Sequence, residues 1–175
     1  FDRHSVNVMV GHEYYKTTTK FLGAIAQGGF SPSIPEIDAF AKISDASSYK
    51  SGYNVEGYFG SAQYNYDQKY FASASFRRDA SSYFAKENRW GNFWSVGGAW
   101  LISKENFMQS SASWLNMLKL KFSVGQQGND NIGAYAYTDL YDLVPTGSTS
   151  MGATFKRMGN PDITWETTTN YNLGV

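Results

Sequence analysis

The chain has 175 residues, and its charges balance, with 15 Lys and Arg against 15 Asp and Glu. A net charge of zero argues against a nucleic-acid partner, which requires a basic surplus, and against a polybasic anchor on a membrane surface. The absence of cysteine excludes disulfides and thiolate metal sites. An aromatic share of 17% together with 17 glycines is typical of antiparallel β-structure with one apolar and one polar face.

Six segments alternate between apolar and polar side chains with a period of two, which predicts strands. In chain order, these strands are expected at residues 5–14, 53–66, 70–78, 93–102, 117–125 and 163–175. About ten residues is also the length that a tilted strand needs to cross a bilayer. The sequence contains no run of about 18 apolar residues, so no transmembrane helix is predicted.

The predicted connections differ in length. The polar turn Asp67–Lys69 joins the second and third strands, whereas the first and second are separated by a long stretch that contains QGGFSPSIPEID. The third connection (79–92) and the last one (126–162) are also long, and the fourth is expected to begin a short helix near Ser103. Short turns that alternate with long loops are typical of outer-membrane barrels.

The more apolar face of the predicted sheet carries aromatic residues toward both strand ends, and small residues such as Ala72, Ala74 and Gly98 between them. This arrangement predicts the aromatic girdles of a transmembrane barrel. The residues expected to face lipid or form the girdles are Tyr64, Tyr66, Tyr70, Phe76, Trp94 and Trp100, with Trp90 and Phe93 near the same strand ends. The residues expected to face the lumen are Gln63, Asn65, Ser73, Ser75, Arg77, Lys119 and Lys121.

An alternative interpretation is a secreted, soluble β-sandwich that binds carbohydrate and exposes many tyrosines. Its apolar face would be buried against a second sheet, about 10 Å away. The membrane interpretation instead requires that face to remain uncovered by protein. Both interpretations predict an all-β protein.

No catalytic or metal-binding arrangement is predicted, and hence no enzyme and no cofactor. His4 and His12 would lie about 25 Å apart on one strand, too far to share a metal ion. Asp79 and Glu87 resemble a glycosidase pair only superficially, because both are expected in one flexible loop, where a surface ion pair with Arg77, Arg78 or Arg89 is the simpler explanation. The GNDN run at 128–131 lacks the regular acidic spacing of a calcium loop.

Four stretches together resemble the barrel of SusC/RagA-type TonB-dependent outer-membrane transporters of Bacteroidetes-type bacteria. They are KYFASASFRRDASSYF, NRWGNFWSVGGAWLISKENFM, WLNMLKLKFSVGQQGN and GNPDITWETTTNYNLGV, in that order. The resemblance extends back through FGSAQYNYDQKY and VMVGHE. The sequence departs from the family pattern at Ala80, Tyr83, Trp94 and Gln127, all at loops or strand ends.

The resemblance implies that residues 1–175 are a segment of a barrel of about 22 strands, whose plug domain and remaining strands are absent from this chain. It also implies a bacterial outer-membrane location, energy from TonB, a SusD-like surface lipoprotein as a lid, and oligosaccharide or peptide as cargo. Six strands cannot close a membrane barrel, so the segment is not expected to transport anything alone. The first candidates for contact with cargo or lid are three aromatic loop residues, Tyr135, Tyr137 and Tyr141.

Overall fold

The computed structural model describes residues 3–111 and 113–175, which form eight strands and three short 3-10 helices. The strands are β1 (His4–Gly29), β2 (Phe40–Tyr66), β3 (Tyr70–Ser81), β4 (Trp90–Leu101), β5 (Lys119–Asn129), β6 (Leu140–Pro145), β7 (Met151–Arg157) and β8 (Glu166–Gly174). The helices are η1 (Ile37–Ala39), η2 (Ile102–Lys104) and η3 (Asn106–Ser111). The all-β prediction is confirmed.

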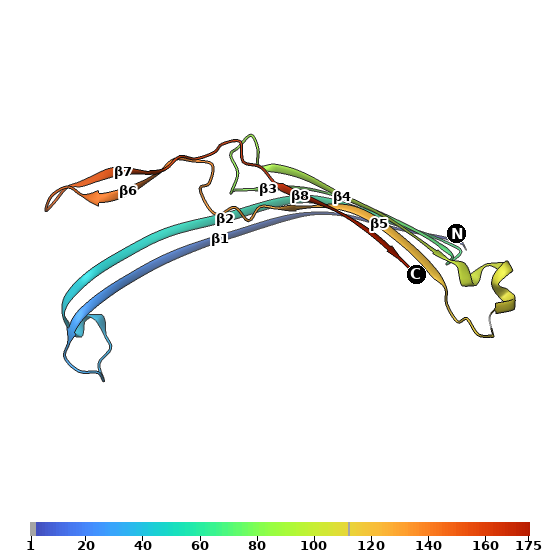
Figure 1. Cartoon of the computed structure of the whole chain (residues 1–175), viewed down its shortest axis with the longest axis horizontal. Coiled ribbons are helices and arrows are strands. Elements are labelled where there is room, and N and C mark those ends of the chain that lie inside the picture. Colours follow the sequence, from blue (N-terminus) through green and yellow to red (C-terminus); the bar gives the residue numbers. More distant parts are fainter. Residues whose placement is uncertain (1–2, 112) are drawn as a thin grey trace. The chain divides into compact units, whose positions relative to one another are not determined.

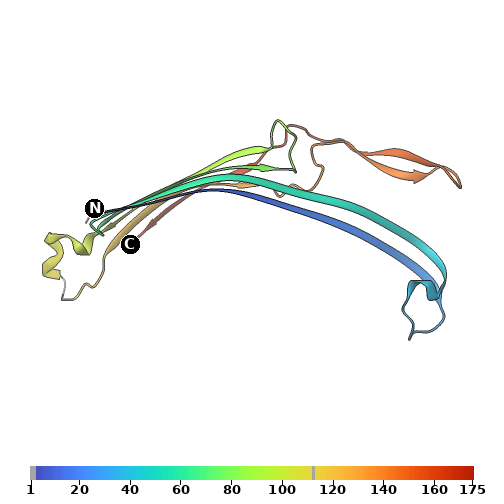
Figure 2. The same cartoon turned by 180° about the vertical axis from the view of Figure 1, so that it is seen from behind.

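Six strands form one sheet in the order β1-β2-β3-β4-β5-β8 (Figure 1), which matches the six predicted strands in number and order. The registers of β2 through β8 are antiparallel. Figure 2 shows β8 beside β5 from the opposite side. β1 begins and β8 ends at the end of the sheet that carries the Asp67–Lys69 turn, here called the turn end.

The β6–β7 hairpin is absent from the predicted elements. It forms a separate two-stranded sheet within the connection from β5 to β8. Its strands are short, at 6 and 7 residues, and they flank a Gly- and Ser-rich turn. The sequence pattern of such a segment is that of a loop, because too few alternating positions are present to establish a period of two.

β1 and β2 are far longer than predicted, at 26 and 27 residues. Residues 16–54 form a unit of their own, a hairpin whose loop lies at 30–39, within the stretch that carries the Gly and Pro breakers. Phe21 and Tyr49 stack across this hairpin with ring centroids 5.1 Å apart. Runs such as TTTK and SDASSYKSG place small polar residues on both faces, so the apolar alternation that marks a strand is missing.

The turn end is built by the three-residue turn Asp67–Lys69 between β2 and β3. Asp67 and Gln68 both have φ of 53°, and the N–H of Lys69 donates to the carbonyl of Tyr66 over 3.0 Å. Positive φ at both central positions is the geometry whose twist suits neighbouring strands. At the same end, the helix expected from Ser103 is present as two 3-10 helices, η2 and η3.

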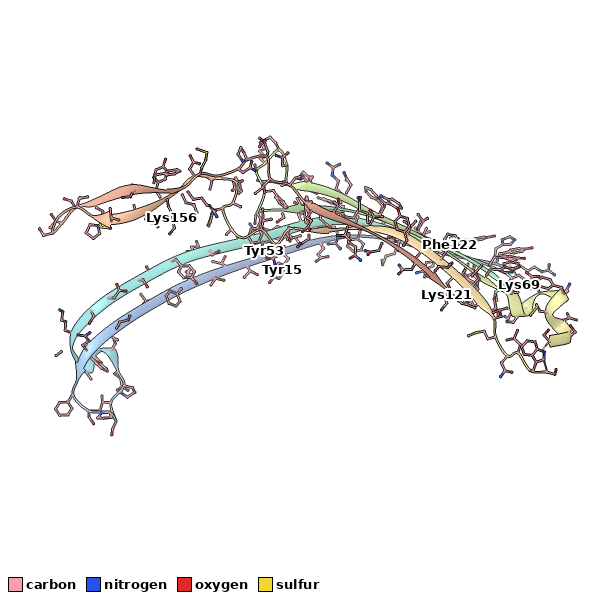
Figure 3. All side chains as sticks on the ribbon, in the orientation of Figure 1. Tyr15, Tyr53, Lys69, Lys121, Phe122 and Lys156 are labelled. Atoms are coloured by element: carbon pink, nitrogen blue, oxygen red, sulfur yellow. The ribbon has the colours of Figure 1, made fainter. Side chains whose placement is uncertain are left out.

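The register gives the sheet two distinct faces. Ala62, Ala74, Val96 and Val124 are direct neighbours across four strands and therefore share one face. Lys121 and Phe122 are adjacent on β5 and point to opposite sides (Figure 3). The face that carries Ala62 is here called the apolar face, and the face that carries Lys121 the polar face.

The apolar face is left uncovered by the described residues. Phe76 is 52% exposed, Trp94 41% and Val96 43%. A sandwich would bury these side chains under a second sheet, and in the described residues β6 and β7 pair only with each other. Within the described residues, the second sheet that a soluble sandwich requires is therefore not found. The buried hydrophobic residues gather instead beyond and beside the ends of β3 and β4, and they include Ala80, Phe84, Ala85 and Phe93.

Candidate functional site: a sheet with two unlike faces

An aromatic row crosses the apolar face at the turn end. His4 lies 4.9 Å from Tyr66, Tyr66 lies 6.2 Å from Tyr70, and Tyr70 lies 6.3 Å from Trp100, all measured between ring centroids. The register explains the row, because Tyr66 pairs with Tyr70 and Tyr70 pairs with Trp100. Four successive strands thus contribute one ring each to a continuous band.

A second row crosses the same face toward the other strand ends. The rings of His12 and Tyr58 are 4.6 Å apart, and those of Tyr58 and Trp90 are 6.2 Å apart. The Arg78 guanidinium lies over the Trp90 ring at 5.1 Å. A cation stacked on an indole keeps its polar edges free for water or phosphate, as suits a boundary between apolar and aqueous surroundings.

The separation of the rows matches a membrane. Tyr58 and Tyr66 are eight positions apart on β2, which is about 27 Å along a strand and about 20 Å of height at a tilt near 40°. The apolar band of transmembrane barrels is about 25 Å tall. Between the rows, the apolar face carries small or aliphatic side chains together with the aromatic rings of Tyr64, Phe76, Trp94 and Phe122. The small or aliphatic residues include Val6, Val8, Val10, Ala62, Ala72, Ala74, Val96, Gly98 and Val124.

The six residues predicted for the girdles all lie on the apolar face, since their register positions alternate with those of the polar face. Tyr66, Tyr70 and Trp100 belong to the row at the turn end, and Tyr64 hydrogen-bonds His4 beside it. Phe76 and Trp94 are direct partners near the second row. That lipid covers this face stays a prediction.

The seven residues predicted to face the lumen all lie on the polar face. Hydrogen bonds link neighbouring strands there, between the hydroxyls of Ser75 and Ser95 at 2.7 Å and from Asn172 to Ser123 at 3.3 Å. Lys119 lies over the Phe71 ring at 4.5 Å. The polar face thus carries charges and hydroxyls, whereas no charged side chain of the described residues lies between the two rows on the apolar face. A wall between water and lipid requires this difference.

Arg77 organises the charges of the polar face. Its Nε donates to both carboxylate oxygens of Asp79, at 2.7 and 2.6 Å, and an Nη donates to Glu13 at 3.1 Å. The guanidinium also lies over the Phe59 ring at 5.4 Å. The expected ion pair of Asp79 with an arginine is confirmed, but its expected place in a flexible loop is wrong: Asp79 belongs to β3 and is only 7% exposed.

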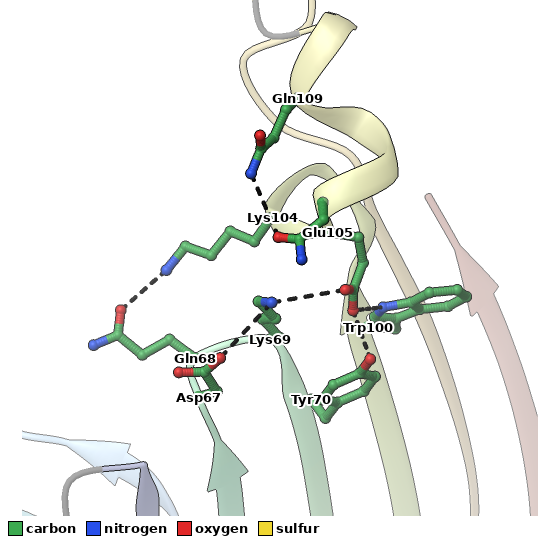
Figure 4. Close-up of polar contacts among 9 residues, drawn as sticks. Asp67, Gln68, Lys69, Tyr70, Trp100, Lys104, Glu105 and Gln109 are labelled. Atoms are coloured by element: carbon green, nitrogen blue, oxygen red, sulfur yellow. Dashed lines mark hydrogen bonds and ion pairs between the residues drawn. The ribbon is translucent and has the colours of Figure 1, made fainter.

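A polar cluster ties the connection after β4 to the turn end (Figure 4). Glu105 accepts hydrogen bonds from the Tyr70 hydroxyl at 2.5 Å and from Trp100 Nε1 at 3.1 Å. Lys69 lies 3.7 Å from both Glu105 and Asp67, and Lys104 donates to Gln68. The hydrogen bond from Tyr70, with that from Trp100 and the charge of Lys69, holds the pKa of Glu105 below its usual value.

An aromatic clasp joins two connections at the opposite end. Trp165 contacts Phe84 and Phe93, with ring centroids 5.3 and 5.2 Å away, and its indole donates to the Arg89 carbonyl at 2.9 Å. Asn88 donates to the Pro161 carbonyl at 2.9 Å. The loop 82–89 and the segment before β8 are therefore locked together.

The aromatic clasp shows that the expected outward position of Phe93 is wrong, and it contains one residue that was not predicted, Trp165. The sequence pattern groups Phe93 with the outward aromatic residues, but Phe93 lies on the polar face and is 7% exposed. Its ring covers Gly91 and Gly128, where a Cβ would overlap it. Trp165 is not among the residues predicted from the sequence, and only its position just before a strand could have suggested a packing role.

The three tyrosines predicted from the sequence fall into different settings. Tyr135 has φ of 61°, is 45% exposed, and accepts a hydrogen bond from Arg157 through its carbonyl. Tyr137 is half-buried in the same loop. Tyr141 is not a loop residue, contrary to expectation: it lies on β6, 57% exposed, with its ring edge-on to Phe155 at 5.7 Å.

Within residues 3–111 and 113–175, no group of three or more His, Asp or Glu side chains could hold a metal ion. Over the same residues, no helix is long and apolar enough to cross a membrane. Glu87 is exposed in its loop, whereas Asp79 is engaged by Arg77, so the two carboxylates do not form a catalytic pair.

Comparison with known proteins agrees with this geometry. The family model described as "TonB dependent receptor-like, beta-barrel" matches residues 2–175. The chain is 31% identical to TonB-dependent receptor P26 of Formosa agariphila over 99% of its length, which is 18% of that protein. It is 34% identical to TonB-dependent receptor SusC of Bacteroides thetaiotaomicron over 77% of its length and 14% of that protein.

The solved structures agree as well. A chain of the RagAB peptide transporter superposes with a TM-score of 0.89 at 30% identity, covering 99% of this chain and 19% of that one. The chain thus spans about a fifth or less of the relatives that it matches. The two-faced antiparallel sheet, the family match and the superposition together establish that the chain belongs to the TonB-dependent receptor β-barrel family, whose members reside in the bacterial outer membrane.

Proposed function

We propose that residues 1–175 form part of the barrel wall of a TonB-energised nutrient importer in the outer membrane. The observation that carries the proposal is the uncovered apolar face between two aromatic rows, opposite a face that bears Arg77, Lys119 and Lys121. A lysine or arginine in the midplane of the lipid costs about 2–4 kcal/mol. The polar face therefore belongs to the lumen and the apolar face to lipid.

The remaining parts of the importer are supplied by the rest of the protein. A membrane barrel needs at least about eight strands to close, and an open sheet would leave unpaired backbone groups at its edges in lipid. The main sheet here has six strands. Further strands and a plug domain in the full-length protein complete the barrel, and TonB engages parts outside this chain.

The cargo is an oligosaccharide or a peptide, taken up with a SusD-like lipoprotein as lid. This part of the proposal is supported by likeness to SusC and to a chain of the RagAB peptide transporter. Contacts with cargo or lid come from Tyr135, Tyr137 and Tyr141, because tyrosine offers a flat apolar ring with a polar tip. On the β6–β7 hairpin, Tyr141, Leu143 and Phe155 are each more than half exposed.

The test begins with the full gene expressed in a Gram-negative host. We expect the product to remain in the outer-membrane fraction after a carbonate wash and to run faster on gels before heating than after, as closed barrels do. Deleting the gene in its own organism should abolish growth on one glycan or peptide source, and the gene should restore it. Recovery of the full-length product as a soluble monomer would overturn the proposal.

A further inference from the structure

The connection between β4 and β5 is attached to side chains of the apolar face of the sheet rather than to those of the polar face. The N–H of Ser103 donates to the Leu118 carbonyl at 3.2 Å, which closes residues 103–118 into a loop at the turn end. Within that loop, Glu105 accepts hydrogen bonds from Tyr70 and Trp100. Both donors belong to the aromatic row on the apolar face, so the loop continues that face past the strand ends (Figure 4).

Beyond Glu105 the loop has a composition unlike that of a loop in water. Residues 106–118, NFMQSSASWLNML, contain no charged residue. Large apolar side chains are nevertheless exposed there: Phe107 is 65% exposed, Trp114 74% and Met117 68%. An uncharged segment with several exposed large apolar side chains requires a covering surface.

The adjoining residues identify that surface. Tyrosine and tryptophan rows mark the level of the lipid headgroups, and the loop hangs directly on Tyr70 and Trp100. Lys104 lies beside the loop at the turn end and donates to the neutral side chain of Gln68, so its charge can meet the anionic headgroup phosphates. Short turns of such barrels lie on the periplasmic side, so the adjacent leaflet is the inner leaflet of the outer membrane.

We propose that residues 106–111 and 113–117 form an interfacial membrane anchor. The segment lies along the inner leaflet of the outer membrane and inserts Phe107, Trp114 and Met117 at the boundary between headgroups and acyl chains, as interfacial segments do. Glu105 holds it against the barrel, so its depth fixes the height of β4 and β5 in the bilayer. The inference rests on the proposed barrel, and its partner is lipid rather than a periplasmic protein.

The test uses the full-length transporter in a cysteine-free background, reconstituted into vesicles of phosphatidylethanolamine and phosphatidylglycerol. Phe107→Cys, Trp114→Cys and Met117→Cys each carry an environment-sensitive fluorophore. These side chains are exposed, so labelling does not disturb a core, and heat-dependent gel mobility confirms folding. Two quenchers are compared: a nitroxide attached near the lipid headgroup and a nitroxide dissolved in water.

Two control labels bracket the result. Ala74→Cys reports the apolar face, and Ser73→Cys, its neighbour on β3, reports the polar face. We expect the lipid nitroxide to quench the labels at Phe107, Trp114 and Met117 at least as strongly as the label at Ala74, which lies deeper in the bilayer, and several-fold more strongly than the label at Ser73. Quenching by the water-soluble nitroxide alone would overturn the anchor, and so would protection from both quenchers, since that would place a protein over the loop. If the lipid nitroxide does not quench the label at Ala74→Cys, the result contradicts the proposed barrel and not only the anchor.

Discussion

Arg77 and Asp79 lie side by side on the polar face of β3, with Nε of the arginine 2.6 Å from Oδ2 of the aspartate. The two residues are separated by one position, so their side chains project from the same face of the strand. Gly57 is the register partner of Asp79, and a Cβ there would overlap the carboxylate. The glycine thus makes room for a charge-assisted contact in which the single Nε–H of Arg77 is shared between both oxygens of the Asp79 carboxylate.

The first prediction concerns that pair. Asp79→Ala leaves Arg77 with Glu13 as its remaining carboxylate partner at 3.1 Å. Because the Arg77 side chain is still 38% exposed, the free energy of unfolding should fall by about 1–3 kcal/mol rather than by the larger loss of a fully buried pair. Urea unfolding of the full-length barrel in detergent micelles or lipid measures the change.

A matched control is the exposed pair of Lys156 and Asp142 on the β6–β7 hairpin, whose side chains are 55% and 54% exposed. Lys156→Ala should lower the free energy of unfolding by less than about 1 kcal/mol. An Asp79→Ala effect no larger than that of Lys156→Ala would show that the Arg77 pair does not stabilise the wall.

The second prediction tests which face meets lipid. Ala74 and Ser73 are neighbours on β3 and point to opposite faces. Ala74→Arg should destabilise the barrel by about 2–4 kcal/mol because it places a charge near the middle of the bilayer. Ser73→Arg adds the same group to a face that already carries Arg77 and Lys121, and it should cost much less. Equilibrium unfolding in lipid vesicles compares them, and equal costs would contradict the assignment of the faces.

The strands differ in how strongly their sequences predict them. Strands of the main sheet alternate Leu, Val, Tyr or Trp with Ser, Asn or Lys, so the amino-acid pattern alone predicts their order and their two faces. The parts of β1 and β2 within residues 16–54 carry hydroxyls and lysines on both sides. Without an apolar face to alternate, they have no period to detect.

The sequence pattern also predicts only part of the candidate functional site. Tyr66, Tyr70 and Trp100 of the aromatic row at the turn end could be predicted because each lies on a strand with clear alternation, whereas His4 and His12 were not predicted as members of the rows. The contacts between the rows and the loops depend on tertiary geometry. Nothing local indicates that Glu105 reaches Tyr70, 35 positions away, or that Trp165 packs on Phe84 and Phe93. The pattern around Tyr141 predicts a loop because β6 and β7 are too short to be recognised.

The third prediction concerns the aromatic clasp at the outer loops. Phe84 is fully buried, so Phe84→Ala should open a cavity costing about 3–5 kcal/mol locally and release loop 82–89 from Trp165. Trypsin added to intact cells should then cut at Lys86 or Arg89 faster than in the wild type. Phe30→Ala is the control, because Phe30 is 85% exposed and its loss should leave cleavage at those sites unchanged. Equal cleavage in both variants would mean that the clasp does not restrain the loop.

The fourth prediction is a pH dependence at the turn end. The hydrogen bond from Tyr70, followed by that from Trp100, lowers the pKa of Glu105 in the folded protein relative to the ordinary value of 4.5. A carboxyl whose folded pKa is lowered stabilises the fold above its unfolded pKa, and that stability is lost as pH falls through the folded pKa. The attachment of the loop should therefore be complete at pH 7 and weaken progressively below about pH 4.5.

The measurement is the fluorescence of a label at Trp114→Cys in the full-length protein, recorded from pH 7 to pH 3. We expect the spectrum to shift as the loop detaches in acid. With Glu105→Gln in the same protein, the amide keeps the size of the side chain but loses the titrating charge, so the attachment should be weaker at pH 7 and the shift below pH 4.5 should disappear. Tyr70→Phe removes the largest cause of the lowered pKa, so it should move the transition to higher pH. An identical acid transition in wild type and Glu105→Gln would exclude Glu105 as the titrating group.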